Sequence, residues 1–282
     1  MAGTSETPRA RALGAEIRHA REAAGVGFRE LARRLDISHS ALSHWESGRR
    51  PPSPEDVAGL LGILNVTGEE RDRLLELARD ASDPNWVTPG LDKQLAALIE
   101  YERTATRITE VNPLLVPGLL QTGDYARAIM RAAGATRGEA DHRAMVRIGR
   151  REVLEREEPA APEFHALIGE YAFRYPACEA SVMAAQARHL LRWAQRDNIT
   201  IQVVPMRTGW TPMHSGAFIL MEFARARPVI HLEHYRSSLT LTDGGDGQDY
   251  QAAADMVRRA AMSPDDTAAL IADVAKRLET GT

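Results

Sequence analysis

Apolar residues recur with a helical period along the first 80 residues of the chain, and Gly and Pro interrupt that period at short intervals. Ser38 can cap a helix with its hydroxyl oxygen, and Gly48 is typical of a helix C-terminus. Ser53-Pro54 and Thr67 begin two further helices in the same way. The pattern therefore predicts an all-α N-terminal domain of five helices, at about 9–24, 28–35, 39–47, 54–64 and 67–80.

Beyond a proline-containing stretch at 81–90, the pattern is mixed. Four segments rich in Val, Ile and Phe and bounded by Gly or Pro predict strands at 163–170, 199–205, 216–223 and 228–233. Helical spacing predicts helices at about 91–109, 124–133, 139–157, 179–197, 248–261 and 264–278. We therefore expect a domain at 1–80, a linker at 81–90 and an α+β domain at 91–282.

Length and composition agree with this division. A chain of 282 residues is long enough for two domains, and its single cysteine, Cys178, excludes an intrachain disulfide framework and a multi-cysteine zinc site. The sequence has no apolar run of the roughly 20 residues that a membrane span needs, and its first residues hold no apolar signal-peptide core. We expect a cytoplasmic protein that does not contact a membrane.

The charge is unevenly distributed. The net charge is −4, but residues 1–52 hold nine Arg and six acidic residues, whereas residues 53–282 hold 26 Lys or Arg and 33 acidic residues. The N-terminal segment is therefore basic, whereas the rest of the chain is mildly acidic. This distribution is expected of a chain whose first domain binds nucleic acid.

Residues 27–50 have the pattern of a helix-turn-helix, in which a short turn holds the second helix in a DNA major groove about 12 Å wide. Ala32 allows the two helices to approach, Ile37 fills the turn, and Leu42 and Trp45 anchor the second helix. Hydrogen-bonding side chains remain on its outer face, and arginines lie at its margins. The predicted base-reading residues are His39, Ser40, Ser43 and His44, and the predicted phosphate-binding residues are Arg29, Arg33, Ser38, Arg49 and Arg50.

This segment resembles the helix-turn-helix of phage-repressor-type regulators, the XRE or Cro/C1 family. The resemblance lies in Glu30-Leu31-Ala32, Ile37-Ser38, Leu42-Ser43, Trp45-Glu46 and Gly48, and it implies a lambda-repressor-like domain. Phe28 departs from the Gln common in the family, and His39 and His44 stand where Arg or Gln are frequent. A helical hairpin that contacts only protein is the alternative. We expect a structural role for Glu46, through bonds near the helix end.

The second domain resembles that of actinobacterial WhiJ-like regulators. The resemblance is carried by residues 111–127, 147–152, 169–170, 183–191, 199–205 and 216–223, with departures at 148–150 and 171–172. It implies a domain without enzymatic activity. It also implies a neighbouring gene that encodes a small partner protein, the two genes forming a pair that resembles a toxin–antitoxin system. The resemblance thus implies that this domain binds a small partner protein or a ligand.

Two groups of residues are candidates for that contact. The apolar run at 113–120 and the tyrosine after it are either a contact surface or a buried packing segment; the candidates are Leu114, Leu115, Leu119, Leu120 and Tyr125. Glu170 and Glu233 stand at strand ends, where they either line a pocket or face solvent. We predict no catalytic or metal site and no cofactor, because residues 243–247 lack the Lys-Ser/Thr of a phosphate loop and the pair His231 and His234 has no further ligand.

The sequence favours a regulator of transcription that binds double-stranded DNA with sequence specificity, associates with the nucleoid and forms a homodimer. In this hypothesis its second domain senses a ligand or a small protein encoded by a neighbouring gene. The alternative is an antitoxin-like protein that neutralises such a partner and binds DNA for autoregulation.

Overall fold

The computed structural model describes residues 7–82, 93–234, 237–242 and 244–280. The chain divides into two compact units: the first comprises Met1–Thr104 with Phe223–Ala226, and the second comprises Ala105–Glu222 with Arg227–Thr282. Helix α6 (Lys93–Thr104) thus groups with the first unit, whereas the sequence places the domain boundary before it. Most of the predicted linker at 81–90 lies outside the described residues.

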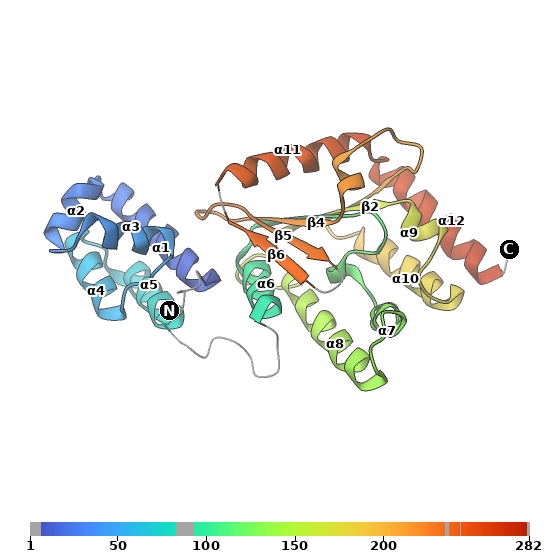
Figure 1. Ribbon diagram of the computed structural model, residues 1–282, viewed down its shortest axis with the longest axis horizontal. Helices are drawn as coiled ribbons and strands as arrows, with labels where there is room; N and C mark the ends of the chain where they lie inside the picture. Colours follow the sequence, from blue (N-terminus) through green and yellow to red (C-terminus); the bar gives the residue numbers. More distant parts are fainter. Residues whose placement is uncertain (1–6, 83–92, 235–236, 243, 281–282) are drawn as a thin grey trace. The chain divides into compact units, whose positions relative to one another are not determined.

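The helical N-terminal region predicted from the sequence is confirmed, and Figure 1 shows its helices in blue to cyan. Caps define several ends: the Thr7 side chain accepts a hydrogen bond from the Ala10 backbone N–H, and Ser53 and Asp56 form a reciprocal capping box. Leu13, Ile17 and Leu31 are among the core residues that these helices bury completely. The helices are α1 (Pro8–Ala23), α2 (Phe28–Arg34), α3 (His39–Ser47), α4 (Pro54–Ile63) and α5 (Gly68–Ser82).

Two glycines allow helix α1 to approach the end of helix α3 closely. A Cβ atom at Gly14 would lie 2.5 Å from the Trp45 carbonyl oxygen, which is closer than real Cβ atoms come to other atoms. Gly48 ends α3 in the left-handed conformation, with φ of +77°, and a Cβ atom there would lie 2.7 Å from the Arg11 Cα. The backbones of the two helices therefore pack directly against each other.

The second unit contains a six-stranded mixed sheet, with strands in the order β3-β2-β1-β4-β5-β6. Strands β1, β2 and β3 are parallel to one another, whereas the pairs β1–β4, β4–β5 and β5–β6 are antiparallel. The sheet and its helices confirm the expected combination of an α domain and an α+β domain. The strands are β1 (Arg107–Asn112), β2 (Glu163–Gly169), β3 (Ile199–Val204), β4 (Phe218–Glu222), β5 (Val229–His234) and β6 (Ser237–Leu241).

Helices cover both faces of this sheet, with α11 on one side and α7, α8 and α10 on the other (Figure 1). Beneath α11, Val257 and Ala254 pack on a buried cluster that includes Val111, Leu220 and Ile230. Helix α12 packs along α10 and closes the β3 edge, where the Thr267 hydroxyl accepts a hydrogen bond from the Val203 N–H. The longer helices are α7 (Gly123–Ala132), α8 (Arg137–Arg150), α10 (Ala180–Trp193), α11 (Gly244–Ala260) and α12 (Pro264–Thr280); the short ones are η1 (Gly118–Leu120), η2 (Arg151–Leu154), α9 (Tyr171–Arg174) and η3 (Pro212–Ser215).

The sequence prediction was wrong at strands β1 and β6. The helix predicted at 91–109 ends at Thr104, and residues 107–109 belong to β1. β1 lies between two neighbours and buries Thr109 and Glu110 together with its apolar residues, so it lacks an alternating pattern. β6 is an exposed edge strand rich in Ser and Thr. The helix predicted to reach 157 instead ends at Arg150 and continues as η2.

His189 is buried on helix α10, and its pKa leads us to expect that the free energy of unfolding depends on pH. Burial, with Arg151 and Arg192 only 3.3 and 3.4 Å from its ring nitrogens, lowers the pKa of His189 to about 4. The folded state therefore binds this proton less readily than the unfolded state, whose histidine pKa is about 6.5. The resulting contribution is present above pH 6.5, falls as the pH drops, and amounts to about 3 kcal/mol for a shift of this size.

We therefore expect the urea-unfolding free energy of the second unit to fall less steeply between pH 6.5 and pH 4.5 in His189→Gln than in the wild type. The carboxylates that also titrate in this interval are shared by both proteins, so the comparison isolates the imidazole. Parallel pH profiles for the two proteins would contradict a depressed pKa at His189.

Candidate nucleic-acid interface

Helices α2 and α3 are held together by buried side chains and by a tightly bonded turn. Leu31, Ala32 and Leu42 are fully buried. In the turn, the Ile37 backbone N–H donates to the Ala32 carbonyl at 3.0 Å, and the Ser38 hydroxyl oxygen accepts from the Ala41 N–H at 3.0 Å. The position of α3 is therefore fixed by packing on one side, which leaves its other side open to a ligand.

The residues predicted to bind DNA lie on α2 and α3, at the cap before α3 and directly after α3. His44 is half-buried, and the others are exposed: Arg29, Arg33, Ser38, His39, Ser40, Ser43, Arg49 and Arg50. The ring centroid of His39 lies 6.2 Å from that of Phe28, so these two side chains are in contact range at the start of both helices. The structure thus places the predicted side chains at the surface of one helix pair, while their contacts with DNA stay a prediction.

The arginines of this surface differ in how far protein carboxylates neutralise them. Glu30 pairs with Arg34 at 2.7 Å and with Arg33 at 3.5 Å, and the hydrogen bond from Arg34 lowers the pKa of Glu30. Within the described part of the chain, Arg49 and Arg50 have no carboxylate within ion-pair distance. Their charge is therefore available to an external anion.

Glu46 has the structural role that the sequence suggested, but its partners lie on α1. Its side chain is 4% exposed and accepts hydrogen bonds from Arg18 at 3.3 Å and from Arg21 at 2.6 and 3.1 Å. These bonds raise the pKa of Arg21, whose guanidinium also lies 5.8 Å from the Phe28 ring centroid. Arg18 and Arg21 are not among the residues predicted from the sequence. Their spacing of three residues, which places them on one helix face, is the signal that could have identified them.

In the second unit, most of the candidate partner-binding residues belong to the interior. Leu119, Leu120 and Tyr125 are buried and Leu115 is half-buried, whereas Leu114 is exposed. Burial raises the pKa of Tyr125 to about 12. The burial of these residues fits the second alternative given above, a buried packing segment. Of the five candidates, Leu114 alone is exposed.

Gln186 fixes this segment against helix α10. Its amide oxygen accepts from the Thr122 N–H at 2.7 Å, and its amide nitrogen donates to the Leu120 carbonyl at 2.8 Å. Gln121 donates to the Val116 carbonyl at 2.7 Å and accepts from Arg147 at 3.0 Å. A buried polar network therefore holds the loop between β1 and α7 in place.

The two candidate glutamates have different surroundings. Glu170 is buried, where it accepts from the Met206 N–H at 2.9 Å and from Arg174 at 2.7 Å, and these bonds lower its pKa against the effect of burial. It therefore ties the chain after β2 to the chain after β3. Glu233 is exposed at the end of β5, and the neighbouring His231 imidazole, with Arg147 and Arg150 nearby, lowers its pKa to about 2. Glu233 lines a cavity, as the sequence allowed.

The structure also describes the surroundings of His231, of Cys178 and of residues 244–247. His231 lies 3.2 Å from the Thr240 hydroxyl, and burial raises the pKa of the half-buried Cys178. Residues 244–247 form the first turn of α11. Among the described residues, no three or more His, Cys, Asp or Glu lie close enough together to hold a metal ion.

Comparison with protein families finds a matching family model for each of the two parts of the chain. Residues 12–74 match a helix-turn-helix domain, and residues 95–273, more than half of the chain, match the domain of unknown function DUF5753. The chain belongs to the DUF5753 family. The DUF5753 match spans the whole six-stranded sheet, and the helix-turn-helix match supports an XRE-like, DNA-binding regulator. No curated protein and no solved structure matches this DUF5753 chain. None of its described helices combines the length and apolar character needed to cross a membrane.

Proposed function

We propose that this chain is a sequence-specific transcriptional regulator whose helix α3 enters the major groove of double-stranded DNA. The observation that carries the proposal is the surface of α3: exposed His39, Ser40 and Ser43 stand on a helix whose opposite side is anchored by buried Trp45 and Glu46. Hydrogen-bonding side chains on a rigid helix are what base reading requires.

The charges around α3 support two groups of residues, one that binds the DNA phosphates and one that reads the base edges. Arg49 and Arg50 follow the helix without a protein counter-ion in the described chain, so we assign them to the phosphates. Arg33 shares Glu30 with Arg34 and contributes less charge. Ser40, Ser43 and His44 are assigned to base edges, with His39 at the start of the helix.

We propose further that the regulator acts in the cytoplasm at the nucleoid as a homodimer, which would place two copies of α3 about 34–36 Å apart on a pseudo-palindrome. The resemblance to WhiJ-like regulators supports a sensory role for the DUF5753 domain, toward a ligand or a small protein encoded nearby, and supports no enzymatic role. The antitoxin-like alternative rests on that resemblance alone. Light scattering of the free protein and footprinting on DNA test the dimer: a monomer that protects a single half-site would exclude it.

Fluorescence anisotropy tests the main proposal directly. The full chain is titrated against DNA from its own upstream region and against a scrambled duplex, across a salt series. We expect a preference of about 10³-fold or more and a steep salt dependence. Equal affinity for both duplexes, with and without the co-expressed neighbouring protein, would contradict sequence-specific regulation from this site.

Arg49→Ala is expected to weaken binding to specific and scrambled DNA alike and to lower the salt slope by about 1, because one phosphate contact is lost. Arg34→Ala is the matched control, since Glu30 already pairs with its guanidinium at 2.7 Å. A loss as large in Arg34→Ala as in Arg49→Ala would show that general charge, and not the position of Arg49, determines binding.

Ser40→Ala and His44→Ala are expected to change which sequence is preferred, at a cost of about 1–3 kcal/mol on the native operator and with little change on scrambled DNA. The measurement is anisotropy competition with operators substituted at single positions. Equal losses on specific and scrambled DNA would remove both residues from the base-reading face.

A further inference from the structure

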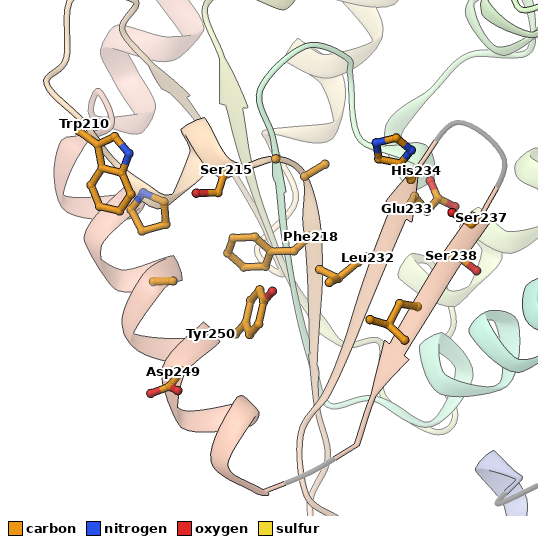
Figure 2. A pocket seen from close by; sticks show the side chains of 15 residues that line it. Trp210, Ser215, Phe218, Leu232, Glu233, His234, Ser237, Ser238, Asp249 and Tyr250 are labelled. Atoms are coloured by element: carbon orange, nitrogen blue, oxygen red, sulfur yellow. The ribbon is translucent and has the colours of Figure 1, made fainter.

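A cavity of about 560 Å³ lies in the second unit, between helix α11, the η3 segment and the strands β4, β5 and β6. Figure 2 shows the Phe218 and Tyr250 rings at its centre, Trp210 on one side and His234 on the other. Leu232 and Leu239 add apolar surface from β5 and β6. Its volume falls within the range of about 300–1,000 Å³ that is typical of small-molecule sites.

The cavity lies at the edge of the sheet where ligands bind in open α/β sheets. β4 is antiparallel to both β1 and β5, so β5 runs in the same direction as the parallel strands β1, β2 and β3. His234, at the carboxyl end of β5, therefore lies at the carboxyl edge of the parallel strands. Crevices outside this edge are the usual ligand sites of such sheets.

Aromatic rings give the cavity its chemical character. Phe218 and Tyr250 pack edge to face, with ring centroids 5.0 Å apart and planes inclined at 73°. The Trp210 side chain is 70% exposed and that of Leu239 is 55% exposed, although both line the cavity. A large exposed indole beside further apolar surface is typical of a surface that a ligand covers.

The charged lining residues are acidic. Asp249, on the same helix as Tyr250, and Glu233 both carry carboxylates, and no Arg or Lys occurs among the described lining residues. Side chains alternate along a strand, so Leu232 and His234 share one face of β5 and Glu233 projects from the other. Asp249 lines the cavity from α11, the helix that also carries Tyr250, and is therefore the carboxylate that we assign to an occupant.

We propose that this cavity binds a small planar aromatic cation, which stacks on Trp210 and the Phe218–Tyr250 pair and places its positive charge at Asp249. Aromatic faces and a carboxylate both attract a cation, and a flat ring system buries the exposed indole. A planar aromatic cation would be the ligand class for the sensory role proposed above. Only the effect of this ligand on DNA binding rests on the proposed function; its binding to the cavity does not.

The test uses the full chain without DNA and three flat tricyclic probes at pH 7.5: cationic 9-aminoacridine, neutral acridine and anionic 9-anthracenecarboxylate. We expect saturable binding of 9-aminoacridine, followed by its fluorescence, with an affinity at least tenfold above that of the anion. Trp210→Ala should weaken this binding at least tenfold. Asp249→Asn should weaken binding of the cation about fivefold and leave acridine binding within twofold.

Tyr175→Ala is the matched control, because Tyr175 is a 57% exposed aromatic residue that does not line this cavity. The proposal is overturned if none of the probes binds, if Trp210→Ala binds as tightly as the wild type, or if the anion binds as tightly as the cation. DNA anisotropy on the same proteins separates the two proposals: probe binding without DNA binding would refute the regulator and leave the cavity assignment standing, and the reverse result would refute the cavity assignment alone.

Discussion

Gly14→Ala is expected to destabilise the helix-turn-helix unit by about 3 kcal/mol, although alanine is the better helix former. A Cβ atom at Gly14 would lie 2.5 Å from the Trp45 carbonyl oxygen and 2.9 Å from that of Glu46. Both are backbone atoms, so no side chain can rotate away, and α1 must separate from α3. The cost of that separation exceeds the helix-propensity gain of about 1 kcal/mol.

Gly59→Ala is the control, since Gly59 also lies inside a helix but a Cβ atom there meets nothing within 4 Å. It should stabilise the unit by about 1 kcal/mol. Hydrogen exchange followed by mass spectrometry on peptides from α1 and α3 reports the stability of this unit separately from the rest. Slower exchange in Gly14→Ala than in the wild type would contradict the direct backbone packing of α1 on α3.

The two glycines also show what the sequence could predict. Gly48 was recognised because a glycine after a helix has a local signature, and its positive φ confirms that role. Gly14 has no such signature, because its neighbours Trp45 and Glu46 are some thirty residues away in the chain. In the same way, the recognition helix was predictable from its local pattern, whereas the ion pairs between α1 and Glu46 were not.

The second unit departs more from the sequence prediction, for similar reasons. Strand β1 buries both faces, so its neighbours β2 and β4 define it and its own pattern does not. The apolar run at 113–120 had two interpretations that differ only in burial. The cavity beneath α11 could not be predicted, because segments near Trp210, Leu232 and Tyr250 form it only once the sheet has assembled.

Glu46→Ala is expected to destabilise the first unit by about 3 kcal/mol, because breaking a buried ion pair leaves a charge without its partner. The Arg21 side chain is only 11% exposed, and its guanidinium makes two of the hydrogen bonds to Glu46. Because Glu46 lies on α3, its loss also loosens the recognition helix, so specific DNA binding should weaken. Urea unfolding and operator anisotropy measure the two effects.

Glu30→Ala is the matched control, because the Glu30 carboxylate also pairs with two arginines but is 42% exposed. Exposed pairs contribute about 0–1 kcal/mol, so Glu30→Ala should change stability little. The double variant Arg21→Ala with Glu46→Ala should recover part of the loss, since it removes the unpaired guanidinium as well. Equal destabilisation by Glu30→Ala and Glu46→Ala, or strictly additive losses in the double variant, would show that the buried pair does not fix α3 on α1.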